Sequence, residues 1–128
     1  MRTQQEEANL KLVQRIYDEV LGPIDPGPVD EIFAPSYIQH NPNVDTGSEA
    51  LKAMLVRAKA RSPDAVHIVK RLIADGDLVA AHVHVIFTPG ERGLAVVDIF
   101  RIEDGKVAEH WDVAQPIPET AANTNTMF

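Results

Sequence analysis

Two carboxylates and a histidine stand in otherwise apolar segments near the C-terminal end of the sequence. Asp98 lies in LAVVDIFRI (94–102), and His110 and Asp112 lie in VAEHWDV (107–113). Buried carboxylates and imidazoles require hydrogen-bonding or charged partners. Desolvation raises the pKa of a carboxylate and a neighbouring imidazolium opposes that shift, so such a pair can move protons near neutral pH. The pattern indicates a general acid/base site.

The turn between these two runs decides whether the residues meet, because a shift of one residue moves every side chain to the other face. A two-residue turn at Asp104 and Gly105 would place Asp98 and His110 on opposite faces. A three-residue turn that includes Glu103 would place them opposite one another. We favour the second turn, because Glu and Asp suit its right-handed positions and Gly its left-handed one.

The three-residue turn assigns each residue of the predicted hairpin to a face. The face with the acid/base candidates then holds Val96, Asp98, Phe100, Ala108, His110 and Asp112. The opposite face holds Val97, Ile99, Arg101, Glu109 and Trp111.

Length and composition set limits on the class of protein. A chain of 128 residues with a formal net charge of −7 predicts one domain and argues against nucleic acid or an anionic membrane as partner. The absence of cysteine excludes disulfides and thiolate zinc sites. The polar start and the lack of a long apolar run predict a cytoplasmic protein without a signal peptide or membrane span.

The remaining sequence predicts helices followed by strands. A capping box at Thr3 and Glu6 opens an amphipathic helix over 3–21, a short helical turn follows at 29–33, and Thr46 or Ser48 caps a helix that ends near Arg61. After this helix the apolar residues alternate with polar ones, as in strands, and this pattern predicts a four-stranded antiparallel meander. The predicted strands are 66–73, 78–87, 94–102 and 107–113, and residues 116–128 are expected to form an extended tail after a domain spanning 1–115.

Histidines elsewhere in the chain leave alternatives open. His82 and His84 lie two positions apart on one strand and therefore share a face. They could bind a metal with His40 or His110 as third ligand, or hydrogen-bond across the sheet or at a subunit interface. His67 is expected at the surface.

Three local strings resemble a known family. They are YIQHNP (37–42), DGDLVAAHVHV (75–85) and DIFRIEDGKVAEHWDV (98–113). With helices first and a sheet after, they resemble the SnoaL-like polyketide cyclases, in particular the subgroup of predicted aldol-condensation enzymes. This family shares the cone-shaped fold of nuclear transport factor 2, the ketosteroid isomerases and limonene epoxide hydrolase. The resemblance covers about residues 5–115.

The resemblance implies an α+β cone, with about three N-terminal helices on a strongly curved antiparallel sheet of about four main strands. It also implies a deep apolar pocket for a small hydrophobic molecule with a carbonyl group, no metal, no organic cofactor, and a homodimer through the outer face of the sheet.

The resemblance assigns roles to individual residues. It carries the acid/base role of an aldol closure to Asp112, with Asp98 at the partner position able to share that role, and it makes His40 a histidine of the pocket. The chemistry of enolate formation leaves open whether Asp112 or Asp98 is the acid/base, and by the same chemistry His110 and His40 would donate hydrogen bonds to the oxyanion. The expected pocket walls are Tyr17, Phe33, Tyr37, Gln39, His82, His84, Phe100 and Trp111, although the favoured turn points Trp111 outward, where it would anchor a dimer.

Two other functions remain open. The fold also hosts binding modules without catalytic activity. A hydrolase of the limonene epoxide type would need an arginine near the carboxylates, and Arg101 is the only candidate on a strand near them, although the favoured turn points it the other way.

Overall fold

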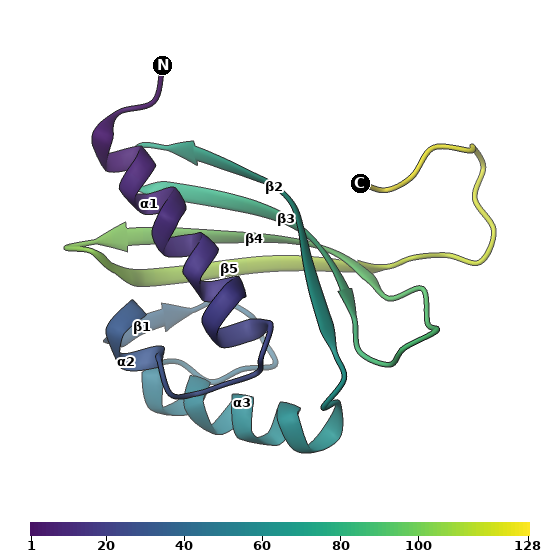
Figure 1. Ribbon diagram of the computed structural model, residues 1–128, viewed down its shortest axis with the longest axis horizontal. Coiled ribbons are helices and arrows are strands. Elements are labelled where there is room, and N and C mark those ends of the chain that lie inside the picture. Colours follow the sequence, from purple (N-terminus) through teal and green to yellow (C-terminus); the bar gives the residue numbers. More distant parts are fainter.

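Helices cover one face of a curved five-stranded sheet in the computed structural model, which describes residues 1–128 (Figure 1). No helix is both long and apolar enough to cross a membrane. The helical segments are α1 (Gln4–Arg15), the π-helical turn η1 (Ile16–Leu21), α2 (Val29–Ile32) and α3 (Ser48–Arg61). The strands are β1 (Phe33–Gln39), β2 (Val66–Asp75), β3 (Leu78–Ile86), β4 (Leu94–Glu103) and β5 (Lys106–Pro116).

The first helix begins as predicted and ends differently. Thr3 and Glu6 form the reciprocal capping box, with each side chain bonded to the other residue's backbone N–H. After Arg15 the helix widens into a π turn, in which the N–H of Gly22 donates to the carbonyl of Tyr17 at 2.8 Å. A Cβ at Gly22 would lie 2.5 Å from that carbonyl oxygen, so this close approach requires glycine. The predicted single α-helix over 3–21 is therefore wrong in its last turns.

The sheet is mixed and has one more strand than expected. The predicted meander is present as β2–β3–β4–β5, and β1 adds to β5 in parallel, which gives the order β1-β5-β4-β3-β2. Pro35 obscures β1 in the sequence, because proline cannot donate to a ladder and is confined largely to edge strands. β1 lies at the edge, and its pairing with β5 is interrupted between Phe33 and Ile38.

The hairpin β4–β5 corrects the predicted turn. Glu103 pairs with Lys106, so the turn has two residues, Asp104 and Gly105, both with positive φ as in a type I′ turn. The expected three-residue turn is wrong. A β-bulge at Ala108 then adds one residue to β5, because Ile102 pairs with Val107 but Arg101 pairs with Glu109.

The bulge restores the predicted distribution of side chains between the two faces. A two-residue turn followed by one bulge residue gives β5 the same alternation of inward and outward side chains as a three-residue turn without a bulge. Asp98, His110 and Asp112 therefore share a face, as expected. The exact partners differ by two residues, because Asp98 pairs with Asp112 and not with His110. Ala108 occupies the bulge, and Val107 is the residue buried in the core.

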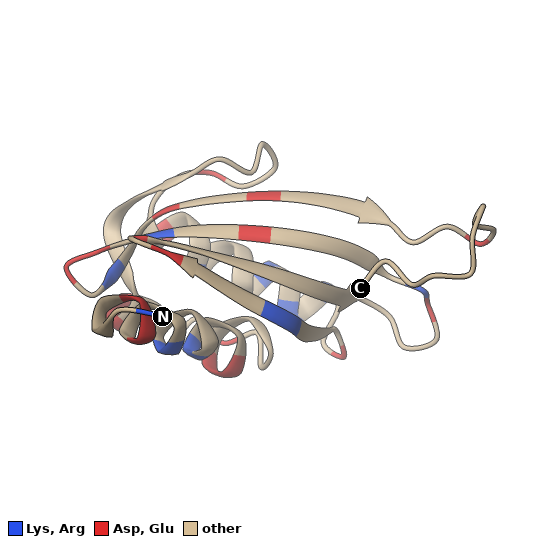
Figure 2. Ribbon diagram, turned by 90° about the horizontal axis from the view of Figure 1, so that it is seen from above, with Lys and Arg blue, Asp and Glu red and all other residues tan.

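The hydrophobic core lies between the helices and the concave face of the sheet. Its inward side chains alternate along the strands, as Val79, Ala81, Val83 and Val85 do on β3. Charged residues lie mostly on the helices and near the strand ends, and a few red and blue bands mark charged positions within the strands (Figure 2). Two of these charged positions are Asp98 on β4 and Asp112 on β5.

Two further details differ from the expected local structure. α3 begins after Gly47, which makes no side-chain cap, and neither Thr46 nor Ser48 is the N-cap. The Thr46 hydroxyl instead donates to the Tyr37 carbonyl at 3.1 Å and accepts from the Gln39 N–H at 3.1 Å. Thr46 therefore stabilises the end of β1.

Candidate active site

Asp98 is the only buried acidic residue, and each of its two carboxylate oxygens has a hydrogen-bond partner. The Tyr17 hydroxyl donates to Asp98 Oδ2 at 2.6 Å, and His110 Nε2 lies 2.9 Å from Asp98 Oδ1. β4 supplies the aspartate, the adjacent β5 supplies the histidine, and the π turn η1 supplies the tyrosine. π turns occur frequently at functional sites. Both oxygens of the Asp98 carboxylate are thus engaged inside the core.

The hydrogen-bond network fixes which ring nitrogen of His110 carries a hydrogen. The Asn41 N–H donates to Gln39 Oε1 at 3.0 Å, and Gln39 Nε2 donates to the Tyr37 hydroxyl at 3.2 Å. Gln39 Oε1 is therefore an acceptor, and His110 Nδ1, 2.8 Å away, must donate to it. The other nitrogen, Nε2, shares one proton with the Asp98 carboxylate, as an imidazolium–carboxylate or a neutral pair.

Asp112 is the second carboxylate of this cluster and the more accessible one. Its side chain is 19% exposed, against 10% for Asp98 and 12% for His110. Asn41 Nδ2 donates to both oxygens of Asp112, at 2.9 and 3.0 Å, and His110 Nε2 lies 3.9 Å from Oδ2. Asp112 therefore has a fixed position and retains free lone pairs.

Aromatic rings surround these polar groups on the inner face. Phe100 is buried and packs against the His110 ring at a centroid distance of 4.9 Å and against Tyr17 at 6.3 Å. Burial, together with the neighbouring charge of Asp98, raises the pKa of Tyr17 far above its usual value, so this phenol keeps its proton and remains a donor.

Two of the other predicted wall residues belong to the core. Phe33 and Tyr37 of β1 are buried and pack against each other at 5.2 Å. Burial raises the pKa of the Tyr37 phenol. Gln39, also predicted as a wall, contacts His110 directly and has the orienting role described above.

His40 does not join the cluster. Consecutive strand residues face opposite sides, and His40 turns to the outer face, where Nε2 lies 2.6 Å from Glu109 Oε2. Its ring stacks on Trp111 at 4.8 Å, which agrees with the predicted outward direction of Trp111. The Arg101 Nε also bonds Glu109, at 2.9 Å, so the arginine that a limonene-type hydrolase would need faces away from Asp98.

His82 and His84 also lie on the outer face, between the buried positions of β3. His84 Nε2 lies 2.7 Å from the Arg92 carbonyl, and His82 contacts Arg71. Residues 117–128 form no helix or strand, and Phe128 at their end packs on the rings of His84 at 4.6 Å and His82 at 5.3 Å. The side chains predicted as pocket walls thus contact the tail instead.

The alternative of a metal at His82 and His84 finds no third ligand, because neither His40 nor His110 approaches the pair. The one group of three metal-ligating side chains is Asp98, His110 and Asp112, whose ligand atoms lie within 4.8 Å of one another. Their oxygens and nitrogen are engaged by Tyr17, Asn41 and each other, an arrangement that also suits proton transfer.

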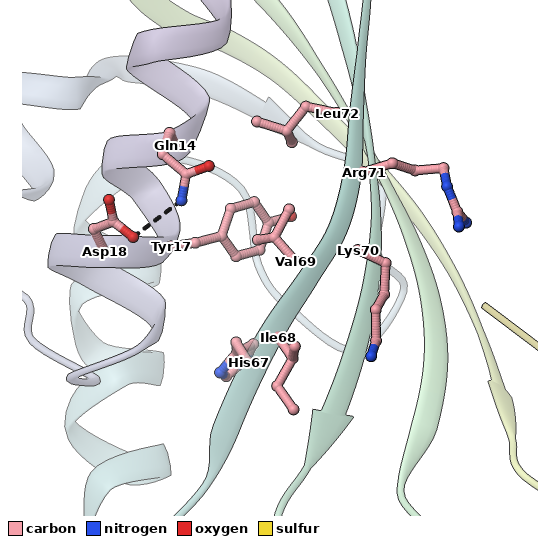
Figure 3. Close-up of a pocket in the computed structure, with 9 residues that line it drawn as sticks. All are labelled: Gln14, Tyr17, Asp18, His67, Ile68, Val69, Lys70, Arg71 and Leu72. Carbon is pink, nitrogen blue, oxygen red and sulfur yellow. Dashed lines mark hydrogen bonds between the residues drawn. The ribbon is translucent and has the colours of Figure 1, made fainter.

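An open cavity of about 560 Å³ lies between the first helix and β2 (Figure 3). It is lined by Gln14, Tyr17 and Asp18 and by residues 67–72 of β2. The expected pocket was apolar and contained the carboxylates, whereas this lining is mixed and Asp98, His110 and Asp112 are not part of it. Tyr17 connects the two regions, because its ring lines the cavity and its hydroxyl bonds Asp98.

Sequence reasoning missed two residues of this region. Asn41 holds Asp112, and the signal was its position before Pro42, which favours an extended backbone. His67, expected at the surface, points inward under the helix because it alternates with exposed residues of β2 (Figure 3). Its inward direction could have been read from the strand period, in phase with Val69.

Solved structures support the fold. A provisionally assigned SnoaL-like polyketide cyclase from Jannaschia sp. CCS1 superposes with a TM-score of 0.75 at 22% identity, covering 89% of this chain and 90% of that one. A provisionally assigned polyketide cyclase from Bacillus cereus gives 0.76 at 20% identity, with 88% and 78% covered. TsrD from Streptomyces laurentii gives 0.66 at 26% identity, with 89% and 90% covered.

The sequence comparison supports the same family. A search of curated proteins gave no significant match. The family model described as the SnoaL-like domain matches residues 13–110, which include Tyr17, Asn41, Asp98 and His110 and cover more than half of the chain. This protein therefore belongs to the SnoaL-like domain family.

Proposed function

We propose that this protein is an enzyme that moves a proton at the carbon next to a carbonyl group of a small molecule, as an aldol-type cyclase, a lyase or an isomerase does. The observation that carries the proposal is the Asp98–His110–Asp112 cluster. It combines a fully engaged carboxylate, an imidazole whose Nδ1 donates to Gln39 and a second, more accessible carboxylate. The provisional assignment of related structures as polyketide cyclases, and of one as a SnoaL-like isomerase, agrees with this class.

Asp112 is the proposed base. Asp98 is a poor candidate, because the Tyr17 hydroxyl and His110 already occupy its two oxygens. Asp112 accepts hydrogen bonds from the Asn41 amide alone and is the more exposed carboxylate. It would take the carbon-bound proton, and the electron pair of that C–H bond would form the enolate.

His110 is the proposed donor to the enolate oxygen. Gln39 holds its Nδ1 hydrogen, so the proton shared with Asp98 at Nε2 is the one available to the substrate. In an isomerase, the proton on Asp112 returns to another carbon. In an aldol closure, the enolate carbon attacks a second carbonyl, and the resulting alkoxide takes a proton.

The test is hydrogen–deuterium exchange at the α-carbon of the bicyclic ketone 1-tetralone in D₂O, followed by proton NMR. The wild type is expected to exchange the probe faster than buffer does. General-base catalysis typically contributes about 10²–10⁴-fold, so Asp112→Asn should lose about that factor. Asp64→Asn, the same change at an exposed loop carboxylate, is the matched control and should keep the wild-type rate.

The histidines provide a second comparison. His110→Gln should reduce exchange much more than His40→Gln, because only His110 contacts both carboxylates. An Asp112→Asn variant that is folded and exchanges the probe at the wild-type rate would show that Asp112 is not the base.

One observation favours a binding module as the second candidate. The open cavity is lined by Tyr17 but not by the carboxylates, and both oxygens of Asp98 are satisfied, as in a structural buried pair. Binding of 1-tetralone in the cavity without exchange above the buffer rate would support this candidate over the enzyme.

A further inference from the structure

The side-chain amide of Asn41 has one N–H that no acceptor of this chain uses. Its nitrogen, Nδ2, lies 2.9 Å from Asp112 Oδ1 and 3.0 Å from Oδ2, and it makes no other hydrogen bond. The two oxygens of one carboxylate lie close together as seen from this nitrogen, whereas the two N–H bonds of a planar amide diverge widely. Both contacts therefore use the same N–H, and the second N–H points elsewhere.

The surrounding backbone fixes the orientation of this amide. The Asn43 N–H donates to Asn41 Oδ1 at 2.8 Å, so the oxygen is held as an acceptor and the nitrogen must face Asp112. The Asn41 N–H donates in turn to Gln39 Oε1, the same atom that accepts from His110 Nδ1. One glutamine oxygen thus holds both the imidazole and the backbone of Asn41 in place before any ligand binds.

The unused N–H lies beside the proposed base and near the proposed donor. Asp112 is the more accessible carboxylate of the cluster, and Asn41 is only partly buried. His110 Nε2 lies 3.9 Å from Asp112 Oδ2. Since the oxygen of a carbonyl group is close to the α-carbon, a molecule whose α-carbon meets Asp112 brings that oxygen within reach of both His110 and Asn41.

We propose that Asn41 is a second hydrogen-bond donor to the enolate oxygen, and that its free N–H completes an oxyanion hole with His110. The amide donates a hydrogen bond and keeps its proton, while the proton removed from the α-carbon goes to Asp112. Preorganised donors aimed at a developing negative charge are the usual composition of such a hole. The inference rests on the proposed function for the reaction itself, but a hydrogen bond from Asn41 to a ligand oxygen does not require turnover.

The first test uses 1-naphthol, which carries an oxygen at the same position as the enol of 1-tetralone and cannot undergo the reaction. In protein labelled with nitrogen-15 at its asparagine side chains, the two hydrogens of Asn41 Nδ2 give separate NMR resonances, and Asn41→Leu identifies them by their absence. One of the two should move downfield with 1-naphthol and much less with naphthalene, and Asp112→Asn should move the other one. Resonances that respond equally to both compounds, or to neither, would overturn the proposal.

The second test measures exchange of the α-protons of 1-tetralone. Loss of one oxyanion donor typically costs about 10²–10³-fold in turnover, so Asn41→Leu should lower kcat by about that factor and change KM much less. Asn125→Leu, the same change at an exposed asparagine of the tail, is the control and should keep the wild-type rate. A folded Asn41→Leu variant that exchanges 1-tetralone at the wild-type rate would also overturn the proposal.

The two proposals can fail separately. If one Asn41 hydrogen responds to 1-naphthol but the wild type does not exchange 1-tetralone, the enzyme proposal fails and Asn41 stands as a donor to a bound oxygen. If Asp112 controls exchange but neither hydrogen of Asn41 responds, Asp112 stands as the base and the inference about Asn41 fails.

Discussion

The Tyr17 hydroxyl donates a 2.6 Å hydrogen bond to Asp98 Oδ2 across the core, joining residues 81 positions apart. The π turn that follows α1 carries the phenol, and Gly22 closes this turn on the Tyr17 carbonyl. This single bond connects the open cavity with the acid/base cluster. It also supplies the buried carboxylate with a hydrogen-bond donor.

Replacing Tyr17 with phenylalanine should destabilise the protein by about 1–3 kcal/mol, because it leaves one oxygen of a buried carboxylate without a donor. Tyr37→Phe is the matched control. The Tyr37 hydroxyl only accepts a 3.2 Å bond from Gln39, so its loss should cost less, at most about 1 kcal/mol. Urea unfolding at neutral pH measures both values. Equal losses for the two variants would contradict the special role of the Tyr17 bond.

Alkaline pH should unfold this protein in a way that depends on Tyr17. Its pKa is raised by burial and by Asp98, so the native state keeps a proton that the unfolded chain releases near pH 10. The stabilisation is fully present below about pH 10 and is lost as the pH rises above it. The slope should approach about 1.4 kcal/mol per pH unit for this group.

Guanidinium unfolding between pH 9 and 11 tests this dependence. Tyr17→Phe should show a shallower decline than the wild type, because it removes one of the two tyrosines with raised pKa values. Parallel stability curves for wild type and variant would show that Tyr17 releases its proton equally in both states.

Gln39 should control the tautomer of His110. Gln39→Leu removes the oxygen that accepts from His110 Nδ1 and from the Asn41 N–H, so both donors lose their partner. Side-chain nitrogen NMR should then show a mixture of tautomers, and α-proton exchange should fall. Gln39→Glu keeps an acceptor and should keep the Nδ1–H form. A single, unchanged Nδ1–H tautomer in Gln39→Leu would contradict the role of Gln39.

The bulge at Ala108 should tolerate deletion of its extra residue but not insertion of another residue after it. Without Ala108, Glu109 follows Val107 directly and still pairs with Arg101, so His110 stays on the inner face and the protein should fold. Inserting one alanine between Glu109 and His110 moves His110 to the outer face, so this variant should be strongly destabilised. Thermal unfolding by circular dichroism should show a cooperative transition for the deletion and a much lower one, or none, for the insertion. An insertion variant as stable as the wild type would contradict this account.

Local periodicity made the shared face of the hairpin predictable. Side chains alternate between the two faces along β4 and β5. Asp98 and Phe100 therefore share a face with His110 and Asp112 whenever the turn and any bulge together add an odd number of residues. The turn was mispredicted, because the sequence around Asp104 and Gly105 suits either turn length and nothing local marks Ala108 as a bulge. The prediction of the shared face was nevertheless correct. One extra residue in the turn and one extra residue in a bulge have the same effect on which side chains of β5 point inward.

The sequence by itself determined the helices, the four-stranded meander, the capping box and the polar cluster of the hairpin, because these depend on neighbours close in the chain. Only the tertiary structure decided the rest. The parallel pairing of β1 with β5 turns Gln39 towards His110 and His40 away from it. The crossing of α1 and η1 over the sheet brings Tyr17 to Asp98. These contacts join residues about 70 or more positions apart. Their geometry depends on how the helices and strands pack, and the spacing of residues within one segment does not show that.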